Sequence, residues 1–217
     1  MNNFYGIILS VGLTIISLFL STYLQRKHNL SEESSRKLIH ISISNWWIIA
    51  MIFFDNWLIA SIIPLLYIIL NVISYQMKLV KAMERTSNNH LGTVYFPISL
   101  LILVIMFFGI WNEPYIGGIG VLIMGYGDGF AGLIGKKYGK HKIVENKTII
   151  GSLSMFLFSL LVSIVLLSIY NPSVWTIEIA FALAIIATLL EMFSKHGLDN
   201  LTVPIVTSTL YFLITIL

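Results

Sequence analysis

The chain has 217 residues, of which 57% are hydrophobic and only 11% are charged, and its formal net charge is +3. Soluble globular domains carry roughly 25% charged residues, so the composition excludes an ordinary soluble protein and indicates an integral membrane protein. Cysteine is absent, which excludes disulfide bonds and thiolate metal sites.

Eight apolar segments follow one another along the chain, and most of them reach the length needed to cross a hydrocarbon core about 30 Å thick. No long polar domain separates them. The pattern predicts an all-α, polytopic membrane helical bundle that forms a single integral membrane domain over residues 1–217. The segments are about 4–24, 38–54, 57–76, 93–112, 115–134, 149–170, 174–193 and 201–217.

The basic residues divide the connections between these segments into two sets. All 13 lysines and arginines and all 5 histidines lie in, or at the edges of, residues 25–37, 77–92, 135–148 and 194–200. The alternate connections are short and contain none of them. An excess of lysine and arginine marks the cytoplasmic side. We therefore expect about eight transmembrane helices with both termini outside, in the cell membrane, and we expect the first segment to stay in the membrane instead of being a cleaved signal peptide.

The first polar cluster along the chain is SEESSRKLIH, residues 31–40. Ser31, followed by two glutamates, is a predicted helix N-cap. Arg36, Lys37 and His40 then share one face of the predicted helix, because residues three and four apart are neighbours on a helix. This face is either a solvated cytoplasmic surface or part of a site. His90 and Asn45 are weaker signals, since such residues are more often structural than catalytic.

Asp128 lies inside the fifth apolar segment, among glycines. If the helix ends near residue 134, Asp128 is roughly 9 Å below its cytoplasmic end. An ionisable group at this depth is costly and usually faces a cavity, a partner or an ion. The alternative is a structural carboxylate paired with a lysine of the next loop.

The glycines around Asp128 stand at positions 125, 127, 129, 132 and 135. They fit the G-x-G-x-x-G pattern formally, but that motif requires a preceding strand in a βαβ unit, which is not predicted here. They also fit G-x-x-x-G, which is typical of close helix packing. So many glycines indicate a loosened or broken helix as well, which membrane proteins tolerate where the backbone is buried or lines a watery cavity.

The loop after this segment is rich in lysine. Lys136, Lys137 and Lys140 fit a role in topology and in contacts with anionic lipid headgroups. Lys147 is different, because it directly precedes TIIGS, where the next helix is predicted to begin. A helix N-terminus offers free N–H groups to an anion, so this stretch is a candidate phosphate cradle made by Lys147, Thr148, Gly151 and Ser152.

The last cluster is EMFSKHGLDNLTVP, residues 191–204. Glu191 is expected at the inner end of the seventh segment, and Asp199 and Asn200 at the start of the eighth. Carboxylate oxygens of this kind are suited to Mg²⁺, which typically binds one or two carboxylates together with substrate phosphates. Asp199 could instead cap the last helix.

Five motifs in this order, RKLIH, HLGTVYFP, GDGFAGLIGKKYGK, NKTIIGS and E…LDNLTVP, resemble the polyprenol/phytol/dolichol kinase family. That family consists of membrane enzymes that phosphorylate lipid alcohols, typically with CTP, and it is distantly similar to the phosphatidate cytidylyltransferases. The resemblance covers residues from about 32 to 204.

The resemblance implies a cytoplasmic pocket that binds CTP or another nucleoside triphosphate, Mg²⁺ and a lipid alcohol within the bilayer, with no nucleic-acid partner. It implies catalytic roles for Asp128, His40 and Lys37, and a metal site made by Asp128, Glu191 and Asp199. It implies substrate contacts from His90 and Asn200. Nucleotide binding would fall to Arg36, Lys136, Lys140, Lys147, Thr148, Gly151 and Ser152.

Two alternatives use similar residues. A phosphatidate cytidylyltransferase-like enzyme would also act on CTP, but it would release pyrophosphate in place of CDP. A small-solute transporter would also bury a carboxylate among helix-breaking glycines. Against transport, the polar residues gather near one membrane face, and the two halves of the chain contain no matched pair of interrupted segments.

Overall fold

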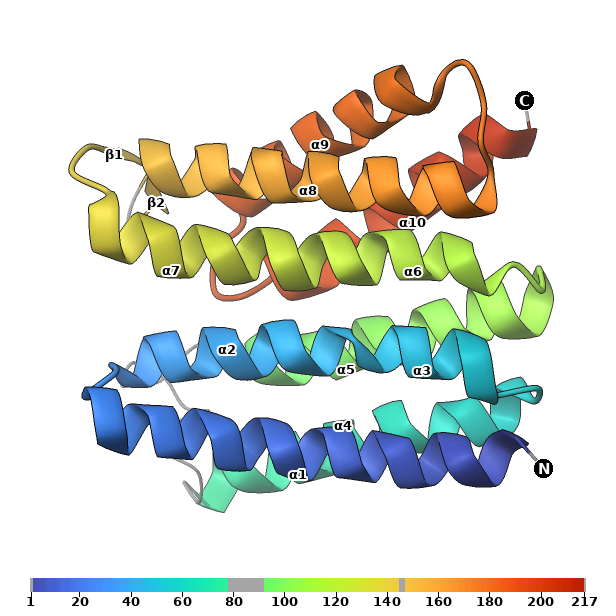
Figure 1. Cartoon of the computed structure of the whole chain (residues 1–217), viewed down its shortest axis with the longest axis horizontal. Helices are drawn as coiled ribbons and strands as arrows, with labels where there is room; N and C mark the ends of the chain where they lie inside the picture. The colour runs from blue at the N-terminus through green and yellow to red at the C-terminus, as the bar shows by residue number, and fades with distance from the viewer. Residues whose placement is uncertain (1, 78–91, 145–146, 217) are drawn as a thin grey trace.

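Apolar segments of membrane-spanning length form helices because a helix satisfies its own backbone N–H and C=O groups where no water can. The computed structural model describes residues 2–77, 92–144 and 147–216, and within them the all-α polytopic bundle predicted from the sequence is confirmed (Figure 1). Its helices are α1 Asn2–His28, α2 Glu32–Ser44, α3 Trp46–Phe53, α4 Trp57–Met77, α5 Gly92–Leu103, η2 Val104–Ile110, α6 Pro114–Leu122, η3 Ile123–Asp128, α7 Gly129–Tyr138, α8 Ile149–Tyr170, α9 Thr176–Phe193 and α10 Asp199–Ile216.

Seven helical stretches in the described part of the chain are long and apolar enough to cross a membrane. The eighth predicted crossing, residues 38–54, is made by two shorter helices, α2 and α3, which follow one another along the bundle and are separated by Asn45. The helix starts at Glu32, ahead of the apolar segment, and Ser31 caps it as predicted by accepting a hydrogen bond from the Ser34 N–H. Both ends of the described chain lie at the same end of the bundle (Figure 1), as an even number of crossings requires.

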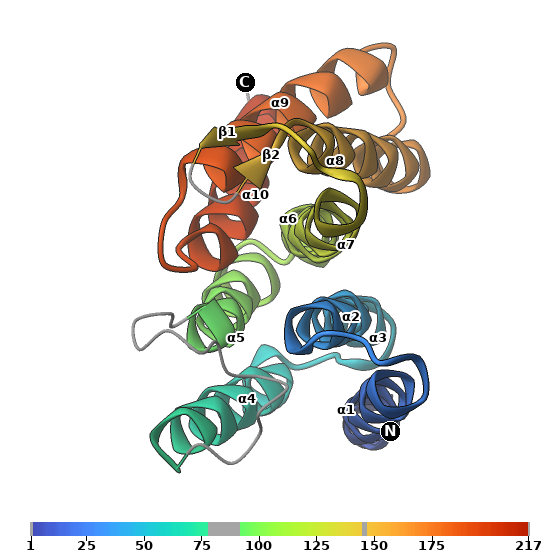
Figure 2. The ribbon, with the colours of Figure 1, turned by 90° about the vertical axis from the view of Figure 1, so that its left-hand side faces the viewer.

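The stretch Pro114–Tyr138 is the central crossing, and 78% of its most apolar 18-residue segment is buried inside the bundle. Its middle segment η3 is a π-helix, wider than an α-helix, and η3 ends at Asp128. The loosened helix that the glycines predict is therefore present, but the chain is not broken. Single turns of π-helix are frequent at functional sites. Figure 2 shows the crossing between α2 on one side and α8 on the other.

A short antiparallel hairpin, which the sequence did not predict, follows α7. Its strands are β1 Lys142–Val144 and β2 Lys147–Thr148, with Val144 opposite Lys147. The hairpin lies at the end of the bundle away from the two termini (Figure 1), the same end as the α1–α2 turn. It therefore brings Lys147 to the end of the bundle that carries the basic residues of α2.

Candidate active site

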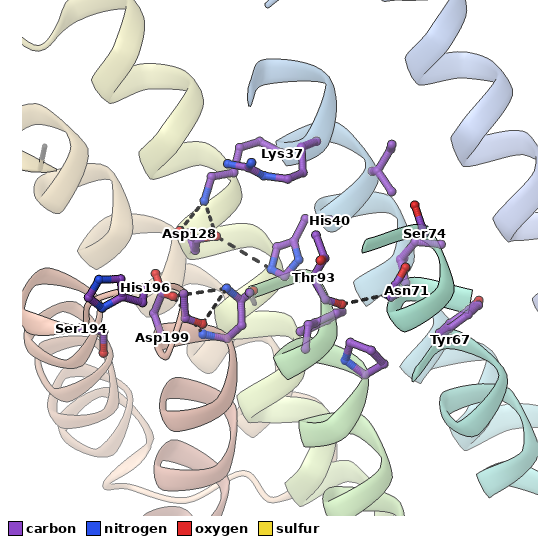
Figure 3. A pocket seen from close by; sticks show the side chains of 18 of the residues that line it. Lys37, His40, Tyr67, Asn71, Ser74, Thr93, Asp128, Ser194, His196 and Asp199 are labelled. Carbon is purple, nitrogen blue, oxygen red and sulfur yellow. Dashed lines mark hydrogen bonds and ion pairs between the residues drawn. The ribbon is translucent and has the colours of Figure 1, made fainter. Parts of the chain in front are cut away.

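A cavity of about 610 Å³ opens at this end of the bundle. That volume falls within the range of roughly 300–1,000 Å³ typical of small-molecule pockets. Its walls come from α1, α2, α4 and α5 on one side, and from η3, the hairpin and the α9–α10 connection on the other (Figure 3). The predicted site residues that line it are Arg36, Lys37, His40, Asp128, Lys147, Asp199 and Asn200.

An ion pair between Lys37 and Asp128 lies in the wall of this cavity. The Lys37 Nζ donates to both carboxylate oxygens of Asp128, at 2.6 Å from Oδ1 and 2.5 Å from Oδ2. Asp128 is only 3% exposed, so the pair supplies the compensating charge that a buried carboxylate requires. In the structural alternative predicted from the sequence, the partner of Asp128 was a lysine of the following loop. The partner is instead a lysine of α2, far away in the chain.

His40 lies beside this ion pair. Its Nε2 is 3.9 Å from Asp128 Oδ2, and its ring contacts Phe96 with the ring centroids 4.3 Å apart. This nitrogen is buried and has no hydrogen-bond partner in the described part of the protein. Buried polar atoms are normally hydrogen-bonded. His40 is part of the cavity wall, and a ligand group that reached this nitrogen would supply the missing hydrogen bond.

A second ion pair forms where the hairpin meets α9 and α10. Lys147 Nζ contacts Glu191 Oε1 and is 3.6 Å from Asp199 Oδ2. Burial opposes the charge on Lys147, but the carboxylates of Glu191, Asp199 and Asp128 outweigh it and raise the pKa of Lys147 above its ordinary value. The side chain therefore remains a cation at neutral pH.

The two ion pairs meet in one cluster of carboxylates. Asp128, Glu191 and Asp199 are all buried, and each places one oxygen within 4.8 Å of the others. The second oxygen of Glu191 is buried without a hydrogen-bond partner among the described residues. Carboxylate oxygens close together are ligands suited to a hard cation such as Mg²⁺. The three residues to which the family resemblance assigned a metal are thus brought together from α9, α10 and η3.

Two of the predicted lysines lie elsewhere. Lys136 donates to Ser31 Oγ at 2.6 Å and to a Glu33 oxygen at 3.4 Å on the exposed surface. Lys140 is exposed, and neither side chain is in the cavity wall. His90, a predicted substrate contact, lies outside the described residues.

The predicted phosphate cradle has another local role in this structure. Thr148 caps α8, because its Oγ1 accepts a hydrogen bond from the Gly151 N–H at 3.1 Å. Gly151 packs against Gly135 of α7 so closely that a methyl group on Gly135 would lie 3.0 Å from the Gly151 Cα. Ser152 is buried. Thr148, Gly151 and Ser152 do not line the cavity, so this helix N-terminus faces α7 instead.

The sequence reasoning missed the contribution of α4. Tyr67, Asn71 and Ser74 line the cavity from this helix (Figure 3). A signal for them was present, because residues spaced by three and four positions share one helix face. Three polar groups on one face of an otherwise apolar span indicate a wall that faces something other than lipid.

No family model and no solved structure matches the chain. It is 32% identical over 182 residues to a phytol kinase of Synechocystis sp., an alignment that covers 80% of this chain and 76% of the relative. It is 31% identical over 212 residues to a probable chloroplastic phytol kinase 1 of Glycine max, covering 87% and 69%. It is 30% identical over 215 residues to the chloroplastic phytol kinase 1 of Arabidopsis thaliana, covering 88% and 70%. The family predicted from the five motifs is confirmed: the chain belongs to the polyprenol/phytol kinase family.

Proposed function

We propose that this protein is a membrane lipid-alcohol kinase. It transfers the terminal phosphate of CTP, or of another nucleoside triphosphate, to the hydroxyl of an isoprenoid or related lipid alcohol at the cytoplasmic face. The family membership supports the reaction class, because the relatives are named phytol kinases. The observation that carries the proposal is the cluster of three buried carboxylates and two lysines in and beside the wall of a cavity that also reaches between membrane helices.

Phosphoryl transfer depends mainly on positioning and on neutralising charge, with little covalent chemistry for the protein to perform. The acceptor oxygen loses its proton and bonds to the γ-phosphorus, while the bond from that phosphorus to the oxygen bridging to the β-phosphate breaks. The products are a lipid phosphate and the nucleoside diphosphate. Lys147 and Arg36, both in the cavity wall, supply cationic contacts for the phosphates.

The carboxylate cluster suits a magnesium ion by its donor atoms and its burial. Asp128, Glu191 and Asp199 would hold the ion, which when bound would supply positive charge to the phosphate oxygens of the nucleotide. Each of two lysines forms an ion pair with one of the carboxylates, Lys37 with Asp128 and Lys147 with Glu191. The chain therefore arranges the oxygens before any ligand arrives.

The acceptor hydroxyl is best placed beside Asp128 and His40. The unpartnered Nε2 of His40 lies 3.9 Å from Asp128 Oδ2, so one hydroxyl can contact both groups. His40 would orient the hydroxyl, and Asp128 would act on it in one of two ways, as the base that accepts its proton or through the ion that it helps to hold. Lys37 bonds both oxygens of Asp128, which fixes the orientation of the carboxylate. A positioned base of this kind contributes about 10²–10⁴-fold to a rate.

The test is product analysis with purified protein in lipid nanodiscs. CTP labelled on either the γ- or the α-phosphate is incubated with Mg²⁺ and a panel of phytol, geranylgeraniol, a polyprenol, diacylglycerol and phosphatidate. We expect γ-label in the lipid product, release of CDP, and loss of the product when EDTA is added. The α-label in the lipid, with release of pyrophosphate, would identify a cytidylyltransferase. Absence of lipid phosphate with CTP, ATP, GTP and UTP would reject the kinase.

A further inference from the structure

The cavity continues away from the charged residues into an apolar arm between four helices. We define this apolar arm by six residues of its lining: Leu18 of α1, Ile43 of α2, Tyr67 and Leu70 of α4, and Phe96 and Pro97 of α5. In Figure 3, Tyr67 lies on α4, on the far side of His40 from Asp128 and Asp199. The arm and the carboxylate cluster are thus two parts of one cavity.

The lining changes from polar to apolar in the same direction on neighbouring helices. On α2, Lys37 and His40 are followed by Ile43, six positions and about 9 Å beyond Lys37. On α5, Thr93 is followed one turn later by Phe96. A cavity that is charged at one end and apolar at the other matches a molecule with a polar head and a hydrocarbon tail.

On α4 the same change runs from Ser74, near the charged end, to Tyr67, about 10 Å deeper. Ser74 is 8% exposed, and its hydroxyl has no hydrogen-bond partner among the described residues. At the deep end, the hydroxyls of Tyr67 and Thr14 are 2.6 Å apart and join α4 to α1. Both residues line the cavity, so we take this bridge as the floor of the arm.

We propose that the apolar arm binds the hydrocarbon chain of the acceptor alcohol, and that the Thr14–Tyr67 bridge limits how much of the chain enters. The inference rests on the proposed kinase function and assigns its acceptor specificity. An alcohol lying in the arm with its hydroxyl at His40 directs that hydroxyl toward Asp128. Because the alcohol enters from the bilayer, where its chain is already out of water, selection depends on fit: a chain that fills the arm gains van der Waals contacts, and a chain too long for it meets the floor.

The experiment changes the arm and measures the preference for chain length. Ile43→Trp and Leu18→Trp fill it from two different helices, and Tyr67→Ala removes its floor. The acceptors are geraniol, farnesol and geranylgeraniol, which differ only in length. We expect each filling variant to lower the kcat/KM ratio of geranylgeraniol to geraniol by at least about tenfold, with the KM for the nucleotide unchanged. Tyr67→Ala should raise the same ratio.

Matched controls come from the outer surface of α1. Ile15 and Tyr5 are 62% and 51% exposed there, so Ile15→Trp and Tyr5→Ala should leave the length preference as in the wild type. Folding is checked by size-exclusion chromatography in detergent. Filling variants that fold and keep the wild-type ratio would overturn the inference.

A second measurement does not depend on turnover. A geranylgeraniol analogue with a diazirine at the chain end is photolysed in the wild-type protein, and labelled peptides are identified by mass spectrometry. Labelling at the segment that contains Tyr67, displaced by excess geranylgeraniol, supports the arm. Labelling confined to the outer faces of the bundle overturns it. If the wild type phosphorylates no alcohol, the proposed function fails, while the labelling still decides whether the arm binds the chain.

Discussion

Lys37 can reach Asp128 from α2 because residue 132, on the facing helix α7, has no side chain. A methyl group on Gly132 would lie 2.6 Å from the Lys37 Cε, well inside van der Waals contact. The lysine stem therefore occupies the space that a Cβ would fill. At this scale a glycine that looks like a helix-packing residue in the sequence determines the position of a charge.

Gly132→Ala should consequently displace the Lys37 ammonium group and reduce activity more than stability. A misplacement of about 1 Å can cost up to about 10²-fold in rate, whereas alanine is the better helix former by about 1 kcal/mol. We expect turnover to fall by tenfold or more, with a nearly unchanged melting temperature. Gly12→Ala is the control, since nothing lies within 4 Å of its Cβ position. Equal turnover in the two variants would contradict this role.

Lys147→Ala tests the nucleotide end of the cavity. Loss of one charge-assisted phosphate contact costs about 1.5–3 kcal/mol, so the KM for the nucleotide should rise by at least tenfold while the KM for the alcohol stays constant. Lys142→Ala is the control, because Lys142 is exposed on the hairpin.

Because the pKa of Lys147 is raised, its charge is fully present below the ordinary lysine value of about 10.4 and is lost only as pH rises through the higher folded-state pKa. The difference between variant and wild type should therefore not change between neutral and mildly alkaline pH. If Lys147→Ala changed the KM for the alcohol and left the KM for the nucleotide unchanged, Lys147 would contact lipid headgroups and the prediction would be wrong.

At the scale of elements, local signals predicted the helix starts but not the contacts between helices. Ser31 caps α2 as predicted, and α8 begins within TIIGS, where a helix start was predicted, although the cap role of Thr148 was not. The break between α2 and α3 was not predicted, because the apolar pattern continues through Asn45. Its side chain donates to the Ile41 carbonyl at 2.8 Å and accepts from the Tyr126 hydroxyl at 2.8 Å, and this second contact depends on tertiary structure.

The bond between Asn45 and Tyr126 ties the α2–α3 junction to η3, next to Asp128. Asn45→Ala should lower the free energy of unfolding by about 1–3 kcal/mol, because it leaves a part-buried hydroxyl without its partner. In a Tyr126→Phe background the same change should cost less, as for any pair that interacts directly. Thermal unfolding in detergent measures both. Additive effects of the two substitutions would show that the bond contributes no coupling.

For the whole molecule, the sequence predicted the class, the number of crossings and the residues that gather at one end. Glu191 and Asp199 could be predicted because each stands at the inner end of its span, and Asp128 could be predicted because it is a carboxylate inside an apolar span. The apolar arm could not be predicted, because its walls come from α1, α2, α4 and α5, and no local pattern brings Thr14 next to Tyr67. The same holds for the pairing of Lys37 with Asp128, which lie 91 positions apart.

The predicted orientation places the charged end of the bundle in the cytoplasm. Because the chain has no cysteine, single cysteines can be introduced without background labelling. Ser173→Cys and Asn56→Cys, in exposed turns at the opposite end, should react with a membrane-impermeant maleimide in intact cells. Lys142→Cys, exposed in the hairpin, should react only after permeabilisation. The reverse pattern would invert the topology.

The central claim is that the cluster around Asp128 carries out transfer to a lipid alcohol, and the most direct test is the rate of γ-phosphate transfer by Asp128→Asn. Asparagine keeps the size and one oxygen for Lys37 but leaves the lysine without its counter-ion, so we expect some loss of stability and compare turnover only in protein that elutes as a folded species in detergent. Turnover should fall by at least about two orders of magnitude, the range for losing a positioned base or electrostatic group. Asp55→Asn, at an exposed turn far from the cavity, should transfer phosphate at the wild-type rate. A well-folded Asp128→Asn protein with near-normal turnover would contradict the account.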